Sequence, residues 1–188
     1  MDITYKILSK FDNYFRKIAL KSHEESLGFD SFQYFSTPFG FFTKALDLIE
    51  EKEGSLRGKK FVDAGSGLGS ICEFARQRGF NVEGIELNPV LCDLSKQIFP
   101  DIKVHNMNVM DFDKYNEFDV IFYWLPFYVE ELRMGFKTKI ENEIRVGSYI
   151  VVYEEEKQNI GKDDRFIPIN LISNINGFEN RIWQKLRD

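Results

Sequence analysis

The sequence predicts an α/β fold: a doubly wound, mostly parallel seven-stranded sheet with a C-terminal antiparallel hairpin and N-terminal helices. Apolar, strand-like runs alternate with helical patterns from about residue 37 to residue 154. Such alternation gives parallel strands joined by helical crossovers. The last third changes character, because two strand patterns meet at Asn174-Ile175-Asn176-Gly177, a typical hairpin signal.

Length and charge limit the possible functions. A chain of 188 residues suits one hydrophobic core. We expect an N-terminal amphipathic helical segment at 1–30 and one domain at 31–188. The net charge of −5 makes nucleic acid an unlikely partner, because phosphate binding depends largely on basic residues.

Two helices are expected before the first strand. Apolar residues at helical spacing predict an amphipathic helix at 3–21. Packing is its usual role, and a substrate cap or a membrane contact is the alternative. Thr37-Pro38 then indicates a helix start, with Thr as the cap, and this second helix extends to about Glu53. Gly54 and Gly58 end it.

The remaining elements follow in order. The expected helices cover 68–78, the stretch from Asn88-Pro89 to before Pro100, and 128–143. The expected strands cover 59–64, 81–86, 102–106, 118–124, 147–154, 166–172 and 178–186.

The first two strands carry the main functional signal. Asp63 ends the first strand, and Gly65, Gly67 and Gly69 follow it at alternating positions. Glycines here let the backbone approach a ligand closely. Glu86 ends the second strand, where an acid can accept hydrogen bonds from both ribose hydroxyls. Together the two segments predict a nucleoside site, and Leu87 is assigned to it as the next residue.

The ligand is deduced from the glycine spacing and from Asp63. The dinucleotide pattern G-x-G-x-x-G fails because Ser70 follows Gly69, and a P-loop lacks its Gly-Lys-Ser/Thr. A carboxylate at Asp63 would repel a pyrophosphate. S-adenosyl-L-methionine has no phosphate and carries a sulfonium and an ammonium, which an acid can pair with. We therefore predict this cofactor, with S-adenosyl-L-homocysteine as its product.

The third and fourth strand ends complete the predicted site. Asn108 and Val109 follow the third strand, where the methyltransferases that the preceding motifs resemble usually place an acid against the adenine. The resemblance implies that Asn108 contacts the adenine through its amide oxygen and Val109 through a backbone group. Tyr123, Trp124 and Pro126 end the fourth strand, where the methyl acceptor is expected. Burial in the core is the alternative for the two aromatic residues.

The two cysteines, Cys72 and Cys92, lie on expected helices without metal-ligand spacing, so no metal site is predicted. The sequence also shows no signal-peptide pattern and no stretch that could span a membrane. Together with the two cysteines, these features favour a reduced, cytoplasmic location.

These motifs resemble motif I and the ribose acid of class I, Rossmann-like methyltransferases. The order Gln33-Tyr34-Phe35-Ser36-Thr37-Pro38, then Asp63 to Gly69, Gly84 to Pro89, and Val120 to Pro126, is similar to the small protein-lysine methyltransferases of archaea and mitochondria. The resemblance implies that Tyr34 and Thr37 close over the cofactor. The chain departs from the family at Leu68 and Asn108, where relatives often have Asp.

The expected function is S-adenosylmethionine-dependent methylation of a protein lysine or another amine. Base methylation is disfavoured because Leu125 and a single proline replace the Asn/Asp/Ser-Pro-Pro pattern. Three alternatives stay open: a small-molecule methyltransferase, a cofactor-binding module without transferase activity, and an interaction protein that keeps only the fold. The oligomeric state is also open.

Overall fold

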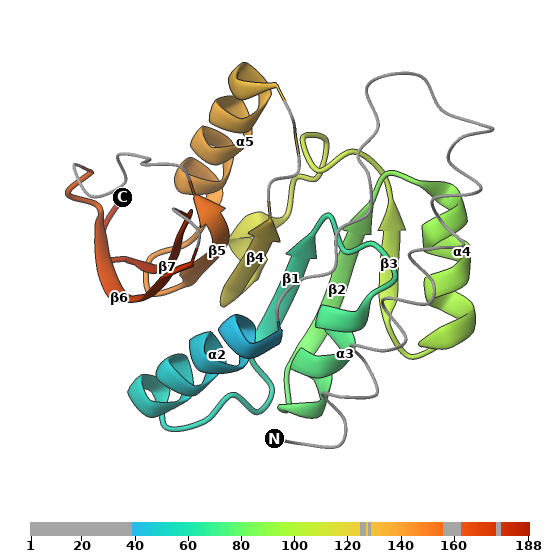
Figure 1. The fold of residues 1–188 in the computed structure, drawn as a ribbon, viewed down its shortest axis with the longest axis horizontal. Helices are drawn as coiled ribbons and strands as arrows, with labels where there is room; N and C mark the ends of the chain where they lie inside the picture. Colours follow the sequence, from blue (N-terminus) through green and yellow to red (C-terminus); the bar gives the residue numbers. More distant parts are fainter. Residues whose placement is uncertain (1–38, 125–126, 128, 156–162, 176–177) are drawn as a thin grey trace.

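A computed structural model describes residues 39–124, 127, 129–155, 163–175 and 178–188. The described strands form one seven-stranded sheet in the order β3-β2-β1-β4-β5-β7-β6 (Figure 1). The first five strands in sequence are parallel, and β6 and β7 add an antiparallel hairpin. The predicted fold class is confirmed. The expected 3–21 helix and the division at residue 30 lie outside the described residues.

The elements are close to their expected positions. The strands are β1 Lys60–Ala64, β2 Asn81–Glu86, β3 Lys103–Asn106, β4 Val120–Trp124, β5 Tyr149–Glu155, β6 Phe166–Ile175 and β7 Phe178–Lys185. The helices are α2 Phe39–Glu53, α3 Ser70–Gln77, α4 Pro89–Ile98 and α5 Glu130–Glu143, with a 3-10 turn, η1, at Tyr115–Glu117. The expectation was wrong for β6, which extends three residues further, so the hairpin turn is shorter. It also missed η1, because three residues carry no periodic signal.

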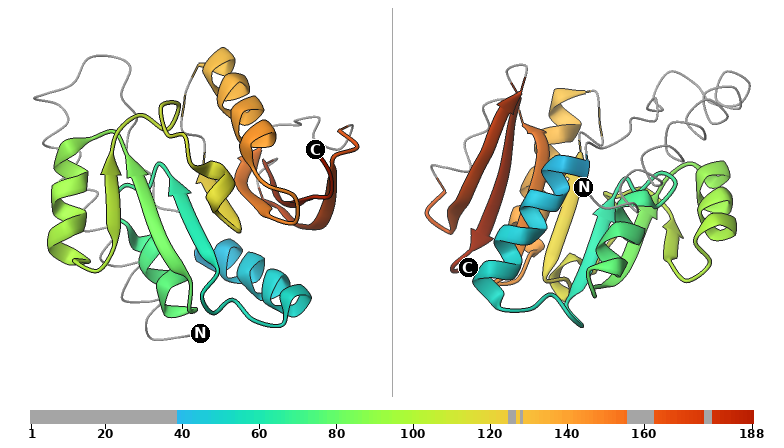
Figure 2. Two further views of the ribbon diagram at one scale, coloured as in Figure 1. Left: turned by 180° about the vertical axis from the view of Figure 1, so that it is seen from behind. Right: turned by 60° about the horizontal axis from the view of Figure 1, so that its bottom comes forward.

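Each face of the sheet has its own apolar core. On one face, α2 and α3 cover alternate residues of the central strands, such as Phe61 and Phe122. On the other face, α5 covers the intervening residues, such as Val62 and Ile121. Figure 2 shows these helices on opposite sides of the strands. Burial on both faces explains why β4, in the middle of the sheet, is apolar at every position.

Helix α2 runs antiparallel to β5. Near its start, the Phe41 ring lies 5.2 Å from that of Tyr153, close to the end of β5. At its other end, Glu53 accepts a hydrogen bond from the hydroxyl of Tyr149, the first residue of β5. The helix therefore begins at the edge where the parallel strands end.

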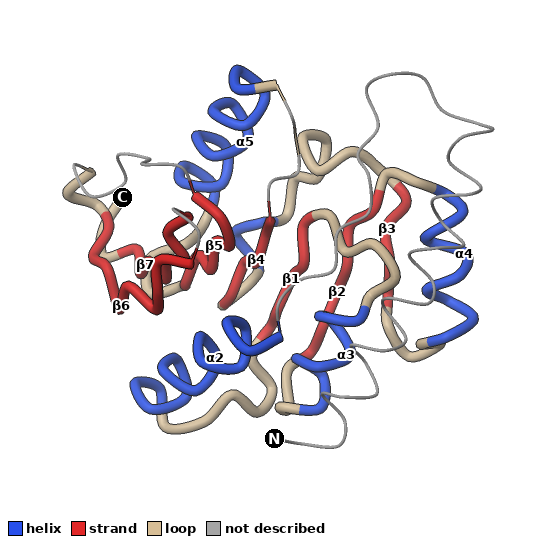
Figure 3. The backbone as a smooth tube through the Cα atoms, in the orientation of Figure 1, coloured by secondary structure: helices blue, strands red, loops and turns tan. Residues whose placement is uncertain are grey.

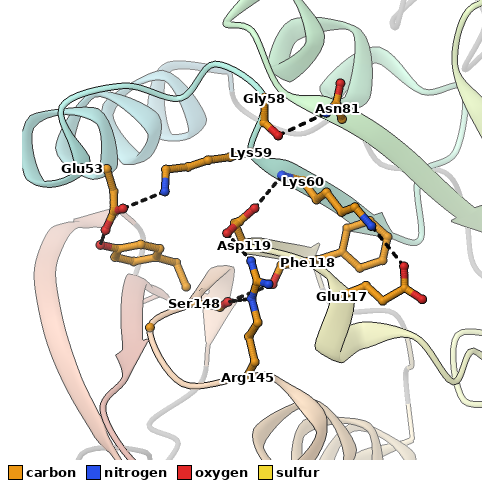
Figure 4. Close-up of polar contacts among 12 residues, drawn as sticks. Glu53, Gly58, Lys59, Lys60, Asn81, Glu117, Phe118, Asp119, Arg145 and Ser148 are labelled. Carbon is orange, nitrogen blue, oxygen red and sulfur yellow. Dashed lines mark hydrogen bonds and ion pairs between the residues drawn. The ribbon is translucent and has the colours of Figure 1, made fainter.

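The opposite, amino-terminal edge of the strands is closed by polar contacts (Figure 4). The Asp119 carboxylate accepts the backbone N–H of Lys60 at 2.7 Å and also pairs with Arg145. The Ser148 hydroxyl donates to the Phe118 carbonyl at 2.9 Å. These contacts join the starts of β1, β4 and β5, and they leave the carboxyl edge as the place for a ligand.

Candidate functional site

The site is built where β1, β2 and β4 end side by side (Figure 3). Ala64 at the end of β1 lies in register with Ile85 of β2 and with Tyr123 of β4. Because β2 and β4 lie on opposite sides of β1, the chain reverses its direction of sheet growth here. Ligands of open α/β sheets bind at such a switch point.

The glycine-rich loop after β1 is fastened to β2. The backbone N–H groups of Gly65 and Ser66 both donate to the Ile85 carbonyl at 2.9 Å. Gly69 then donates to the Ser66 carbonyl at 2.8 Å and begins α3. The loop thus turns tightly over the end of the sheet.

The three glycines serve different purposes. Gly65 is exposed, with φ at +96°, and a Cβ there would meet no atom of the described residues within 4 Å. Its backbone therefore offers an open face that a ligand can approach. Gly67 also has a positive φ of 54°. Gly69 is buried, and a Cβ there would lie 2.7 Å from the Ser95 hydroxyl of α4. Gly69 also has a φ of +82°, so both its backbone conformation and the packing of α3 on α4 require a glycine here.

Glu86 joins the two motifs of the predicted nucleoside site. Its Oε2 accepts the backbone N–H of Gly67 at 2.9 Å, and its Oε1 accepts that of Asn88 at 2.8 Å. Asn88 in turn caps α4 by accepting the Val90 N–H at 2.9 Å. These two hydrogen bonds hold the Glu86 carboxylate at the end of β2, beside the glycine loop.

Asp63 lies beneath the loop and is 3% exposed. It is in register with Gly84 and Phe122, and its side chain is on the α3 face of the sheet. Burial raises the pKa of the nearby Cys72 thiol well above its ordinary value, and the negative charge of Asp63 adds to this effect. Asp63 is thus a buried carboxylate at the end of β1, two residues before the first glycine of the loop.

The loop after β3 has the shape of an Asx turn. The Asn108 Oδ1 accepts the backbone N–H of Met110 at 2.9 Å. Val109 is buried, and its carbonyl accepts a hydrogen bond from the Tyr115 hydroxyl at 3.0 Å. The predicted Asn108 acceptor is therefore already used once, and one lone pair of Oδ1 is left for a ligand. Leu87, at the end of β2, is 59% exposed and offers an apolar surface.

At the end of β4, the structure separates the predicted acceptor residues. Tyr123 is 6% exposed and packs on the Phe136 ring of α5 at 5.2 Å. Trp124 is half-buried on the other face, 5.0 Å from the Tyr153 ring. Pro126, like Tyr34 and Thr37, lies outside the described residues.

The sequence reasoning missed two contacts that shape the site. Gly84 lies under the Ser66 side chain, and Ser95 lies against Gly69. A glycine inside a strand often marks the close approach of other atoms, so the sequence alone could have indicated the contact at Gly84. The contact of Ser95 could not be predicted, because it depends on how α3 and α4 pack.

Both cysteine side chains are buried free thiols. Burial, together with the charge of Glu86, raises the pKa of Cys92 to about 11. Among the described residues, no group of three or more His, Cys, Asp or Glu side chains is placed to hold a metal ion. In the same part of the chain, no helix has the length and apolarity that crossing a bilayer requires.

Comparisons with known proteins give structural likeness only. No family model matches the sequence, and no curated protein matches it. Several solved structures do match the fold. A TehB-like SAM-dependent methyltransferase from Corynebacterium glutamicum is 19% identical, with a TM-score of 0.61 over 96% of this chain and 98% of that one.

Two further matches have a cofactor or its product bound. Magnesium protoporphyrin IX methyltransferase from Synechocystis, with bound SAM, is 15% identical, with a TM-score of 0.62 over 100% of this chain and 98% of the other. An RNA methyltransferase from Salinibacter ruber, in complex with S-adenosyl-L-homocysteine, is 16% identical, with a TM-score of 0.63 over 82% of this chain and 95% of the other. At these identities the likeness establishes a Rossmann-like methyltransferase fold. The acceptors named for these proteins differ.

Proposed function

We propose that this protein is an S-adenosylmethionine-dependent methyltransferase. The observation that carries the proposal is the hydrogen bond between Glu86 and the backbone of Gly67, which brings the ribose acid and the glycine loop together. The fold, which is shared with methyltransferases of known structure, supports the same reading.

The residues present fit this cofactor. We assign the exposed backbone of Gly65 to the methionine portion, and the Glu86 carboxylate, which is positioned by Gly67 and Asn88, to the ribose hydroxyls. Leu87 offers an exposed apolar surface beside Glu86, suited to one face of the adenine. Asp63 supplies negative charge under the loop, which favours a cationic ligand over a pyrophosphate. We also assign Tyr34 and Thr37 to the cofactor side, on the basis of the family resemblance.

When bound, the cofactor supplies a methyl group on a positively charged sulfur. The protein needs no nucleophile of its own, because the acceptor attacks this methyl group directly. Its residues have to hold donor and acceptor in line and keep water out. The aromatic surroundings of the β4 end suit an amine, because its aliphatic stem can pack on the rings, so we favour a protein lysine or another amine as acceptor.

An amine acceptor must lose its proton before it attacks. An ordinary lysine has a pKa of about 10.4, and an apolar site lowers this value by disfavouring the charged form. We therefore expect the transfer rate to rise with pH until it passes the perturbed pKa of the acceptor, and then to level off.

The experiment is incubation with methyl-labelled cofactor and a fractionated cell extract. Label in protein, stable to acid and recovered as methylated lysine, supports the full proposal. Label in a small-molecule fraction supports methyltransferase activity and shows that the acceptor is a small molecule and not a protein lysine. Label in RNA or DNA contradicts the amine acceptor, and no label in any fraction contradicts transferase activity.

A further inference from the structure

The Ser66 side chain lies on the backbone of β2 at Gly84. A Cβ built on Gly84 would lie 2.6 Å from the Ser66 Oγ and 2.8 Å from the Ser66 Cβ. Real Cβ atoms do not approach other atoms this closely, so Gly84 makes room for this serine. Ser66 is 7% exposed, and its hydroxyl has no hydrogen-bond partner among the described residues. Within this part of the chain, the side chain acts by filling space.

This contact is one part of a continuous attachment of the loop to β2. The Ser66 N–H donates to the Ile85 carbonyl, one residue beyond Gly84. Gly67 then donates to the carboxylate of Glu86, the next residue of β2. Three successive residues of β2 thus hold successive parts of the loop. The Cys72 side chain of α3 also lies near Gly84, because a Cβ built on Gly84 would be 3.4 Å from the Cys72 Sγ.

We infer that Gly84 and Ser66 form a steric lock that positions the glycine loop against Glu86, and so determines the affinity for the cofactor. They are positioning residues that act through the loop backbone. The inference rests on the proposed function for its effect on the cofactor. The lock itself does not depend on that function.

The direct test is a double-mutant cycle. Gly84→Ala puts a methyl group into the space of Ser66 and displaces the loop, so S-adenosylhomocysteine affinity falls about tenfold. Ser66→Gly removes both colliding atoms. The double variant Gly84→Ala/Ser66→Gly therefore binds within about threefold of Ser66→Gly alone. Ser66→Ala leaves the Cβ at 2.8 Å in place and rescues little.

Gly40→Ala is the matched control, because a Cβ on this exposed residue of α2 meets no atom of the described part of the chain within 4 Å. It should bind as the wild type does. Calorimetry measures the affinity of each variant for S-adenosylhomocysteine. Urea unfolding without cofactor measures the interaction energy between residues 66 and 84 in the stability of the fold.

The two readouts separate the lock from the proposed function. If the wild type binds no cofactor, the proposed function fails, and the unfolding cycle still tests the lock. The inference of a steric lock is overturned if the two substitutions change the free energy of unfolding additively. It is also overturned if Gly84→Ala binds S-adenosylhomocysteine as tightly as the wild type does. If Gly84→Ala alone does not fold, the double variant must fold, and failure of both overturns the inference.

Discussion

Tyr123 and Trp124 are neighbours in β4, and they lie on opposite faces of the sheet. Tyr123 packs on Phe136 of α5, and Trp124 packs on Tyr153, whose ring also contacts Phe41 of α2. Alternation along a strand requires this arrangement. The two side chains therefore cannot line one wall, and Trp124 is on the same face as the start of α2.

This geometry separates the effects of two substitutions. We expect Trp124→Ala to lower methyl transfer strongly, because the half-buried indole is at the strand end where the acceptor is proposed to lie. Tyr123→Phe should lower it only modestly, since the ring remains packed in the core. Turnover with labelled cofactor measures both. Unchanged turnover in both variants would contradict the proposal that the acceptor binds at the end of β4.

The segment before α2 gives a second prediction. Helix α2 begins at Phe39, at the carboxyl edge of the sheet, and the resembled family uses the preceding residues to cover the cofactor. We expect Tyr34→Ala to reduce methyl transfer with little change in thermal stability. A much lower melting temperature would show that Tyr34 is a core residue.

The sequence was sufficient for the order of strands and helices, because alternating apolar runs and capping signals such as Asn88-Pro89 are local. It was also sufficient to pair the glycine loop with Glu86, since their spacing fits one strand-helix-strand unit. It could not separate the roles of Gly65 and Gly69. One faces open space and the other faces Ser95, and only the packing of α4 decides this difference.

Acid should weaken the attachment of α2. Hydrogen bonds from Lys59 and then Tyr149 lower the pKa of Glu53 below its ordinary 4.5. A lowered pKa in the folded state gives stability above pH 4.5 that is lost as the pH falls through the folded value. Because Glu53 is exposed and solvent screens its charge, we expect Glu53→Gln to lower the free energy of unfolding at pH 7 by only about 0.5 kcal/mol.

Urea unfolding between pH 2 and pH 7 measures this difference. It should shrink toward zero in acid, because the wild-type carboxylate is then protonated. Glu51→Gln, at an exposed acid on the same helix, is the control. A difference that stays constant with pH would mean that the charge of Glu53 contributes nothing.

The thiol beside Glu86 should react slowly. Burial and the negative charge of Glu86 raise the pKa of Cys92 to about 11, so little thiolate exists near neutral pH. Alkylation by iodoacetamide, followed by mass spectrometry, should be slow at pH 7.5 and accelerate up to about pH 11. Rapid alkylation of the folded protein at pH 7.5 would contradict the described environment of Cys92.

The central claim is that Glu86 and the glycine loop form a cofactor site, and calorimetric titration with S-adenosylhomocysteine tests it most directly. We predict binding by the wild type, and binding weaker by about 1 to 3 kcal/mol for Glu86→Ala, which loses charged hydrogen bonds. Glu117→Gln, at the opposite edge of the sheet, should bind like the wild type (Figure 4). No binding by the folded wild type, or equal binding by Glu86→Ala, would contradict the account.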